Sequence, residues 1–156
     1  MIMAEQLDQI LCAVRGGPES RETVTYAIDL ALKSNADLTF FHALDAEFLG
    51  HATIGPLSVV YEELVEMGKF AMLILCDRAQ RRGVNGVNYV VREGNVRHQL
   101  IEAAIETQAE VMVMGRPTRS PTRNVFRPEE MEGFAAELAD VGNLRLILVP
   151  ETLPSE

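Results

Sequence analysis

Short strand-like runs alternate along this chain with longer stretches of helical periodicity, and this alternation restricts the fold more than any other feature. Residues that favour strands occupy 10–14, 37–43, 87–92, 111–114 and 144–149, and apolar residues at helical spacing fill the intervals. Helices between successive strands are typical of an α/β fold, in which right-handed crossovers connect mainly parallel strands. We therefore expect a five-stranded, mainly parallel sheet with helices on both faces.

The length of the chain fits one domain of this kind. A chain of 156 residues can bury roughly two thirds of its unfolded surface around a single core. The sequence contains no internal repeat and no linker. We expect a single three-layer domain over residues 7–150, with flexible ends at 1–6 and 151–156.

The longest helical pattern ends before Gly83, and its spacing predicts which face is buried. The predicted buried residues are Val60, Leu64, Met67, Ala71, Ile74 and Leu75. The same spacing predicts the buried faces of the last two helices, with Ile101, Ala104, Ile105 and Gln108 in one and Phe134, Leu138 and Val141 in the other.

Charge and composition argue against several classes of function. The 23 acidic residues outnumber the 14 basic ones and give a net charge of −9, whereas a nucleic-acid-binding protein needs a broad basic face. No signal-peptide pattern and no bilayer-length apolar run occur, so we expect a cytoplasmic protein without a membrane partner. Cys12 and Cys76 form no Cys-x-x-Cys motif and have no neighbouring His to complete a metal site, so we expect both to be buried, reduced thiols.

Positive charge collects in one segment, directly after the apolar run at 111–114. Gly115 allows the chain to turn there. Four arginines follow without an intervening acid: Arg116, Arg119, Arg123 and Arg127. Three interpretations stay open: a solvated loop whose arginines balance the glutamates that follow, a site for an anion or nucleotide, and a contact for a protein partner.

The first and fourth strands both end at glycine-containing turns. In an open parallel sheet, ligands bind beyond the carboxyl ends of the strands, where the strand order reverses. If these two strands are neighbours, Arg15 and Gly16 face Gly115 and Arg116 across one crevice. Backbone N–H groups at the start of the next helix, together with the guanidinium groups, would then form an anion site.

Five segments in this order resemble the universal stress protein family over nearly the whole chain. They are Ile-Leu-Cys-Ala-Val at 10–14 with its Gly-x-Pro-Glu-Ser turn, Leu-Thr-Phe-Phe-His-Ala-Leu-Asp at 38–45, Arg-Glu-Gly-Asn-Val at 92–96, Ala-Glu-Val-Met-Val-Met-Gly at 109–115 and Leu-Ile-Leu-Val-Pro at 146–150. The resemblance implies an adenine-nucleotide alpha-hydrolase-like fold with strand order 3-2-1-4-5. It also implies a homodimer formed through the last strand, from Leu144 to Val149.

For one branch of that family, the resemblance further implies ATP or AMP bound between the first and fourth strands. Arg15 stands where that branch has an acid, Thr118 stands where its phosphate loop has a glycine, and Gly133 lies near its later Gly-Ser pair. These differences alter the loop's charge and backbone freedom, and the arginines offer another route to phosphate oxygens. The predicted ligand-binding residues are Ala13, Val14, Arg15, Gly16, Ala43, Met114, Gly115, Arg116, Arg119, Arg123 and Gly133.

The sequence offers little for catalysis. It contains no Gly-x-Ser-x-Gly, Gly-x-x-x-x-Gly-Lys-[Ser/Thr] or His-Glu-x-x-His motif, and the sequence predicts no catalytic residues and no metal site. We expect a stress-response or regulatory protein, more readily than an enzyme, with a variant crevice for an adenine nucleotide or another small anion. Two alternatives stay open: a dimeric scaffold of the same family that binds no nucleotide and, less favoured, a small nucleotide hydrolase.

Overall fold

The computed structural model describes residues 6–15, 20–44, 56–117 and 126–150. Its elements are β1 (Gln9–Ala13), α1 (Ser20–Ser34), β2 (Asp37–Leu44), α2 (Pro56–Arg82), β3 (Val87–Glu93), α3 (Val96–Glu106), β4 (Val111–Gly115), the 3-10 turn η2 (Pro128–Glu130), α4 (Met131–Gly142) and β5 (Arg145–Val149). Strands and helices alternate as predicted. Leu7 already belongs to the core and Gln6 is exposed, while the predicted flexible ends at 1–5 and 151–156 lie outside the described residues.

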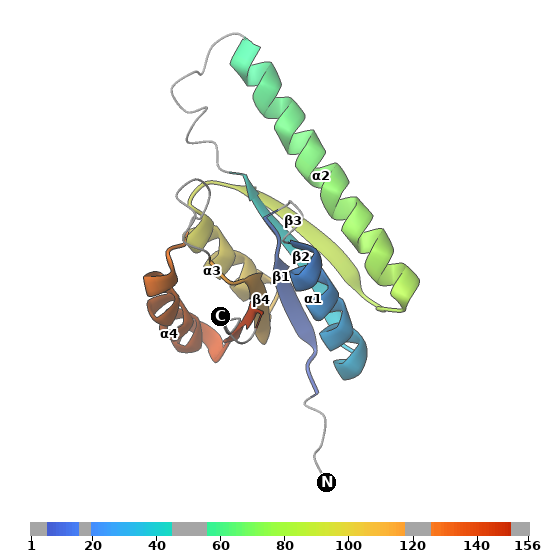
Figure 1. The fold of residues 1–156 in the computed structure, drawn as a ribbon, viewed down its shortest axis with the longest axis vertical. Helices are drawn as coiled ribbons and strands as arrows, with labels where there is room; N and C mark the ends of the chain where they lie inside the picture. The colour runs from blue at the N-terminus through green and yellow to red at the C-terminus, as the bar shows by residue number, and fades with distance from the viewer. Residues whose placement is uncertain (1–5, 16–19, 45–55, 118–125, 151–156) are drawn as a thin grey trace, which may run out of the picture.

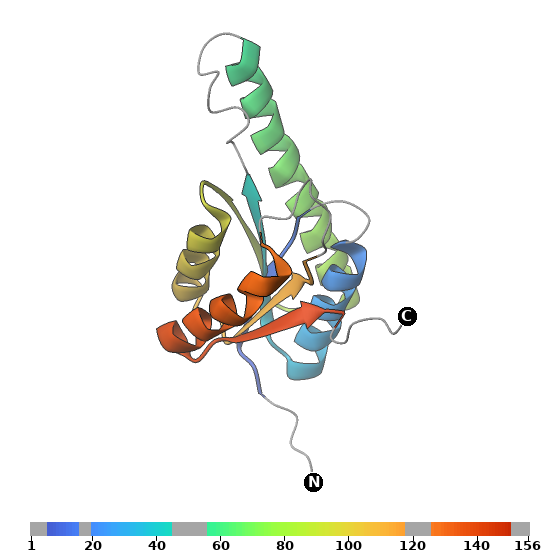
Figure 2. The same ribbon diagram turned by 60° about the vertical axis from the view of Figure 1, so that its left-hand side comes forward.

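Within the described chain, five parallel strands form one sheet in the order β3-β2-β1-β4-β5. β1 is central, and β3 and β5 form the two edges (Figures 1 and 2). Cys12 of β1 pairs with Phe40 on one side and with Val113 on the other. The chain therefore builds outward from β1 to β3 and then returns to the other side of β1, which confirms the predicted strand order.

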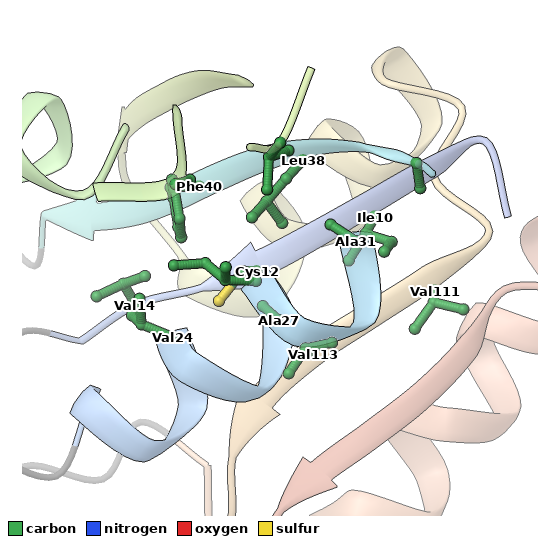
Figure 3. Close-up of a cluster of buried hydrophobic side chains, with 14 of the residues drawn as sticks. Ile10, Cys12, Val14, Val24, Ala27, Ala31, Leu38, Phe40, Val111 and Val113 are labelled. Carbon is green, nitrogen blue, oxygen red and sulfur yellow. The ribbon is translucent and has the colours of Figure 1, made fainter. Parts of the chain in front are cut away.

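Helices cover both faces of this sheet, because side chains point alternately to opposite faces along each strand. Ile10 and Cys12 pack with Val24 and Ala27 of α1, as Figure 3 shows, and Met72 of α2 belongs to the same cluster. The intervening strand residues Leu11, Phe41 and Met112 point to the other face. They form a second cluster with Leu100 of α3 and Phe134 of α4. Burial on both faces explains why the strands read as nearly continuous apolar runs, and the three-layer architecture is confirmed.

Local signals at the helix ends agree with the sequence. Gly83 directly follows α2 with φ of 106°, a conformation that glycine adopts without strain. Asn95 caps α3, since its side-chain oxygen accepts a hydrogen bond of 3.0 Å from the backbone N–H of His98. Asn143 follows α4 with φ of 56° and gives that helix its left-handed end. Gly83 and Asn143 therefore mark the ends of α2 and α4, and Asn95 marks the start of α3.

The buried face of α2 differs from the predicted one. The buried positions are Gly68, Met72, Cys76 and Ala79. Of the predicted face, Leu64 and Leu75 are partly buried, whereas Val60, Met67, Ala71 and Ile74 are exposed. The prediction was wrong because α2 carries more apolar residues than one face can hold, and periodicity does not say which set packs on the sheet.

Two smaller corrections concern α3 and α4. The sequence predicts Ile105, Gln108 and Val141 as buried, but all three are exposed. The buried residues are Leu100, Ala103 and Ala104 in α3 and Met131, Phe134 and Leu138 in α4. Each of these helices packs only a narrow face on the sheet, so the apolar residues at the margin of the predicted face remain in solvent.

Both cysteines are free and buried, as the sequence predicts. Burial raises the pKa of the Cys12 thiol to about 12, and burial also raises the pKa of Cys76 above its ordinary value. A thiol that stays protonated is a poor nucleophile, because the thiolate is the reactive form. Cys12 and Cys76 therefore act as small core residues.

Candidate functional site

The position expected for the crevice is the region beyond the carboxyl ends of β1 and β4, where the strand order reverses. These strands are parallel neighbours, with Ile10 paired to Val111 and Cys12 paired to Val113. Both strands therefore finish at the same end of the sheet, and the helices that follow them, α1 and α4, cover opposite faces (Figure 2). In this class of fold such a point is the usual position of a ligand.

Three of the predicted site residues share one face of the sheet at this edge. Ala13, Ala43 and Met114 come from β1, β2 and β4, and all three belong to the cluster that packs against α3 and α4. Met114 is buried, and the two alanines are partly buried. Their small or flexible apolar side chains make a floor that an aromatic ring can contact without displacing a large residue.

Gly115 follows Met114 at the end of β4 and lies close to α1. A Cβ atom at Gly115 would lie 3.3 Å from Oγ1 of Thr23, which is itself almost fully buried. A larger residue would push α1 away from the end of β4. The glycine predicted as a turn residue is therefore also required for the close approach of α1.

Two hydrogen bonds between Val14 and β2 hold the chain where it leaves β1. The N–H of Val14 donates to the carbonyl of Phe41 over 2.7 Å, and the carbonyl of Val14 lies 2.9 Å from Nδ1 of His42. Because a carbonyl only accepts, His42 carries a proton on Nδ1. Val14 is buried on the α1 face, opposite the floor, so it fixes the backbone at the crevice without lining the floor.

The side chain of Arg116 runs toward the end of β5. Its backbone N–H donates to the carbonyl of Val149, and its Nε donates to the carbonyl of Pro150, both over 2.9 Å. These bonds tie the start of the basic loop to the edge strand. Arg15 lies at the opposite side of the crevice and is exposed. The two arginines therefore follow the neighbouring strands β1 and β4, and the guanidinium group of Arg116 is directed toward β5.

A group of residues at the start of α3 and α4 forms a second wall at the same edge. The rings of Phe126 and Phe134 lie 4.7 Å apart, and the guanidinium carbon of Arg97 lies 5.6 Å from the centre of the Phe134 ring. Arg97 also donates to Glu137 through Nε and Nη2, at 2.9 and 2.6 Å. Gly133 stands beside it, since a Cβ there would lie 4.0 Å from Nη2 of Arg97.

Arg97 is the residue at this edge that the sequence analysis missed. It follows the cap residue Asn95 in the first turn after β3, where a parallel sheet directs side chains toward the ligand edge. That position is the signal that could have found it. The analysis instead followed the arginines after Gly115, of which Arg119 and Arg123 lie outside the described residues, as does Gly16.

A metal cluster and a membrane-spanning helix are both absent from the described residues. Among them, no group of three or more His, Cys, Asp or Glu side chains is arranged to hold a metal ion. No helix in the described part of the chain is both long and apolar enough to cross a membrane. One shallow depression of about 500 Å³ lies beside the crevice, on the α1 face at the end of β5, and is lined by Arg21, Tyr26, Asp29 and Pro150 among others.

Comparison with protein families adds to this geometry. The model of the Universal stress protein family matches residues 6–129, which is most of the chain. The chain belongs to this family. No curated protein compared with the sequence matches it. The resemblance inferred from the five sequence segments is thereby confirmed.

Solved structures of universal stress proteins share the fold. UspA from Lactobacillus plantarum is 18% identical with a TM-score of 0.70, and 92% of this chain and 98% of that chain are covered. A family member from Burkholderia pseudomallei is 22% identical with a TM-score of 0.64, over 92% and 96% of the two chains. A universal stress protein in complex with cAMP is 19% identical with a TM-score of 0.66, over 95% and 100%. At these identities the likeness shows the fold alone.

Proposed function

We propose that this universal stress protein is a regulatory protein whose crevice at the ends of β1 and β4 binds an adenine nucleotide or another small anion. The observation that carries the proposal is the floor of Ala13, Ala43 and Met114, which three neighbouring strands present beside Gly115. Arg15 follows β1 and Arg116 follows β4, and we expect arginines at these two positions to attract phosphate oxygens. A structural relative that was crystallised with cAMP supports the same ligand class.

In this proposal the basic loop replaces backbone contacts with side-chain contacts. Thr118 stands where the nucleotide-binding branch of the family has a glycine, so the loop has less backbone freedom around the phosphates. Arg119 and Arg123 supply forked donors that match phosphate geometry, and Gly133 leaves room beside Arg97. The buried thiols fit a reducing compartment, and we place the protein in the cytoplasm.

Titration with nucleotides tests this proposal. ATP, AMP, cAMP and inorganic phosphate are each added while thermal unfolding is followed. A ligand present at 100 times its dissociation constant is expected to stabilise the fold by about 2.7 kcal/mol, because it binds only the folded state. No shift with any of the four would contradict nucleotide and anion binding and would favour the alternative of a scaffold. Release of phosphate or AMP during the titration would favour the hydrolase.

A matched pair of variants assigns the binding to the loop. Arg119→Ala with Arg123→Ala removes two loop charges but keeps Arg116 and its bond to Pro150. Lys33→Ala with Arg82→Ala removes the same charge from the last turns of α1 and α2, at the end of the sheet where the strands begin. The loop variant is expected to lose the stabilisation and the control variant to keep it. If both variants keep it, the loop is not the site.

We also propose that the protein forms a homodimer through the last strand, from Leu144 to Val149. β5 pairs with β4 on one side only in the described sheet. Arg145 donates to Glu110 and Val149 accepts from Arg116, so the alternate residues Leu146 and Leu148 direct their backbone groups outward. An unpaired edge of this kind can pair with a second copy.

The variant Leu146→Glu is expected to halve the mass of the assembly in sedimentation. Two copies of β5 that meet across a two-fold axis bring equivalent residues together, and like charges there repel. Leu146→Ala serves as the control, since it shortens the same side chain without adding charge. Circular dichroism verifies that both variants are folded. An unchanged mass for folded Leu146→Glu would contradict the interface.

A further inference from the structure

α2 has a second apolar face that no other element covers in the described structure. It is formed by Val59, Val60, Met67, Phe70, Leu73 and Ile74, which we term the outer stripe. Phe70 is 66% exposed and Met67 is 63% exposed, and both lie near the middle of the helix rather than at a frayed end. Large apolar side chains that cluster in this way mark an interaction surface.

The outer stripe lies opposite the face that packs on the sheet. At about 100° per residue, Phe70 is directed some 160° away from the buried Met72. The inner face is close to the sheet at two further places: a Cβ at Gly68 would lie 3.2 Å from Cδ2 of His42, and the hydroxyl of Tyr61 donates a hydrogen bond to Glu93. Burial, that bond and the charge of Glu93 raise the pKa of Tyr61 to about 12. With its inner face anchored, α2 cannot rotate to bury the stripe.

The charges of α2 are unevenly distributed along its length. Its N-terminal half carries Glu62, Glu63 and Glu66, and its C-terminal half carries Arg78, Arg81 and Arg82. Lys69 in the N-terminal half and Asp77 in the C-terminal half carry the opposite sign. Each forms an ion pair within the helix, Lys69 with Glu66 at 3.7 Å and Asp77 with Arg81 at 2.8 Å. One end of the outer face is thus net acidic and the other net basic, with the apolar residues between them.

We propose that the outer stripe of α2 binds the same stripe of a second copy of this chain, with the two helices antiparallel. A two-fold axis level with Met72 places Phe70 of one copy beside Ile74 of the other, since both are equally far from that level. The same axis places Glu63 opposite Arg81 and Glu66 opposite Arg78. Two acidic groups at one end of each copy then meet two basic groups of the partner.

The charge pattern decides between this partner and the alternatives. A parallel arrangement would bring the three glutamates of each copy together, and the repulsion would oppose the apolar contact. An anionic membrane surface would be repelled by the same glutamates and by the net charge of −9. A second copy is favoured because one antiparallel contact brings opposite charges together at both ends of the helix pair. In Figures 1 and 2 the N-terminal end of α2 extends past the strands, so a partner helix can approach it there.

Charge reversal tests the antiparallel arrangement. One variant carries Glu63→Arg with Glu66→Arg, and the other carries Arg78→Glu with Arg81→Glu. Each alone places like charges at both ends of the proposed contact and is expected to lose the α2 association in sedimentation at increasing concentration. An equimolar mixture of the two restores opposite charges at both ends and is expected to recover it. Equal association of each variant alone, or no recovery in the mixture, overturns the proposal.

The apolar contact is tested in a chain whose β5 surface carries Leu146→Glu, so that only the α2 association is measured. Adding Phe70→Glu is expected to leave a monomer, because two charged residues would replace the centre of the contact. Ile105→Glu is the control, since Ile105 is a similarly exposed apolar residue on α3. A monomer before Phe70→Glu is added overturns the proposal. So does the same association with and without that substitution.

Discussion

Replacing Phe134 by alanine is expected to lower the free energy of unfolding by about 3–5 kcal/mol. Phe134 is fully buried in α4, and its removal leaves a cavity that the rigid sheet on one side cannot fill. The ring contact with Phe126 and the guanidinium contact from Arg97 are lost as well. Urea unfolding of the variant and of the native chain measures the difference.

The position of the variant within α4 provides its control. Val141 lies on the same helix and is 46% exposed, so Val141→Ala is expected to change the stability by less than about 1 kcal/mol. A loss for Phe134→Ala that is no larger than for Val141→Ala would mean that α4 is not packed as described. Phe134→Leu keeps most of the volume, and it is expected to fall between the two.

Raising the pH from 8 to 11 is expected to remove roughly 2–3 kcal/mol of stability through Cys12 alone. Burial raises the pKa of this thiol to about 12 in the folded state, from an ordinary value of 9.0. Between those values the unfolded chain loses the thiol proton and the folded chain keeps it. Stability from this group is therefore complete below pH 9 and declines as the pH rises through the interval. Urea unfolding at several pH values measures the slope.

The comparison with Cys12→Ala isolates the contribution of this thiol. The variant is expected to be less stable at neutral pH, because it leaves a small cavity, but its stability should fall less steeply above pH 9. Cys76 and Tyr61, whose pKa values are also raised, retain their own alkaline slopes in both proteins. Parallel slopes for the native chain and for Cys12→Ala would contradict the buried, protonated thiol.

The sheet could be predicted from the sequence because its strands are buried on both faces. A run such as Val111 to Met114 has few alternatives when helices flank it in the sequence, and glycines mark where it ends. The strand order came from the family resemblance rather than from any pattern in the strands. α2 was harder, because both of its faces carry apolar residues and only packing against β2 and β3 decides which one is inside.

The candidate site residues stay predictions. The family resemblance named Ala13, Ala43 and Met114, and in the structure all three pack in one cluster at the ends of neighbouring strands. The wall of Arg97, Phe126 and Phe134 did not follow, because it joins segments that only the folding of α4 beside α3 brings together. Which ligand and which partners the protein takes remain proposals for the experiments above.

The floor of the crevice has a consequence for how this family can diversify. Ala13, Ala43 and Met114 belong to the same apolar cluster that holds α3 and α4 on the sheet, so any change that reshapes the floor also disturbs the core. In the connecting segments, Val14 after β1 and Phe126 before α4 belong to the core clusters as well. Selection for a new ligand would therefore act first on exposed positions such as Arg15 and leave the buried strand ends nearly constant, which makes the exposed positions the part to redesign.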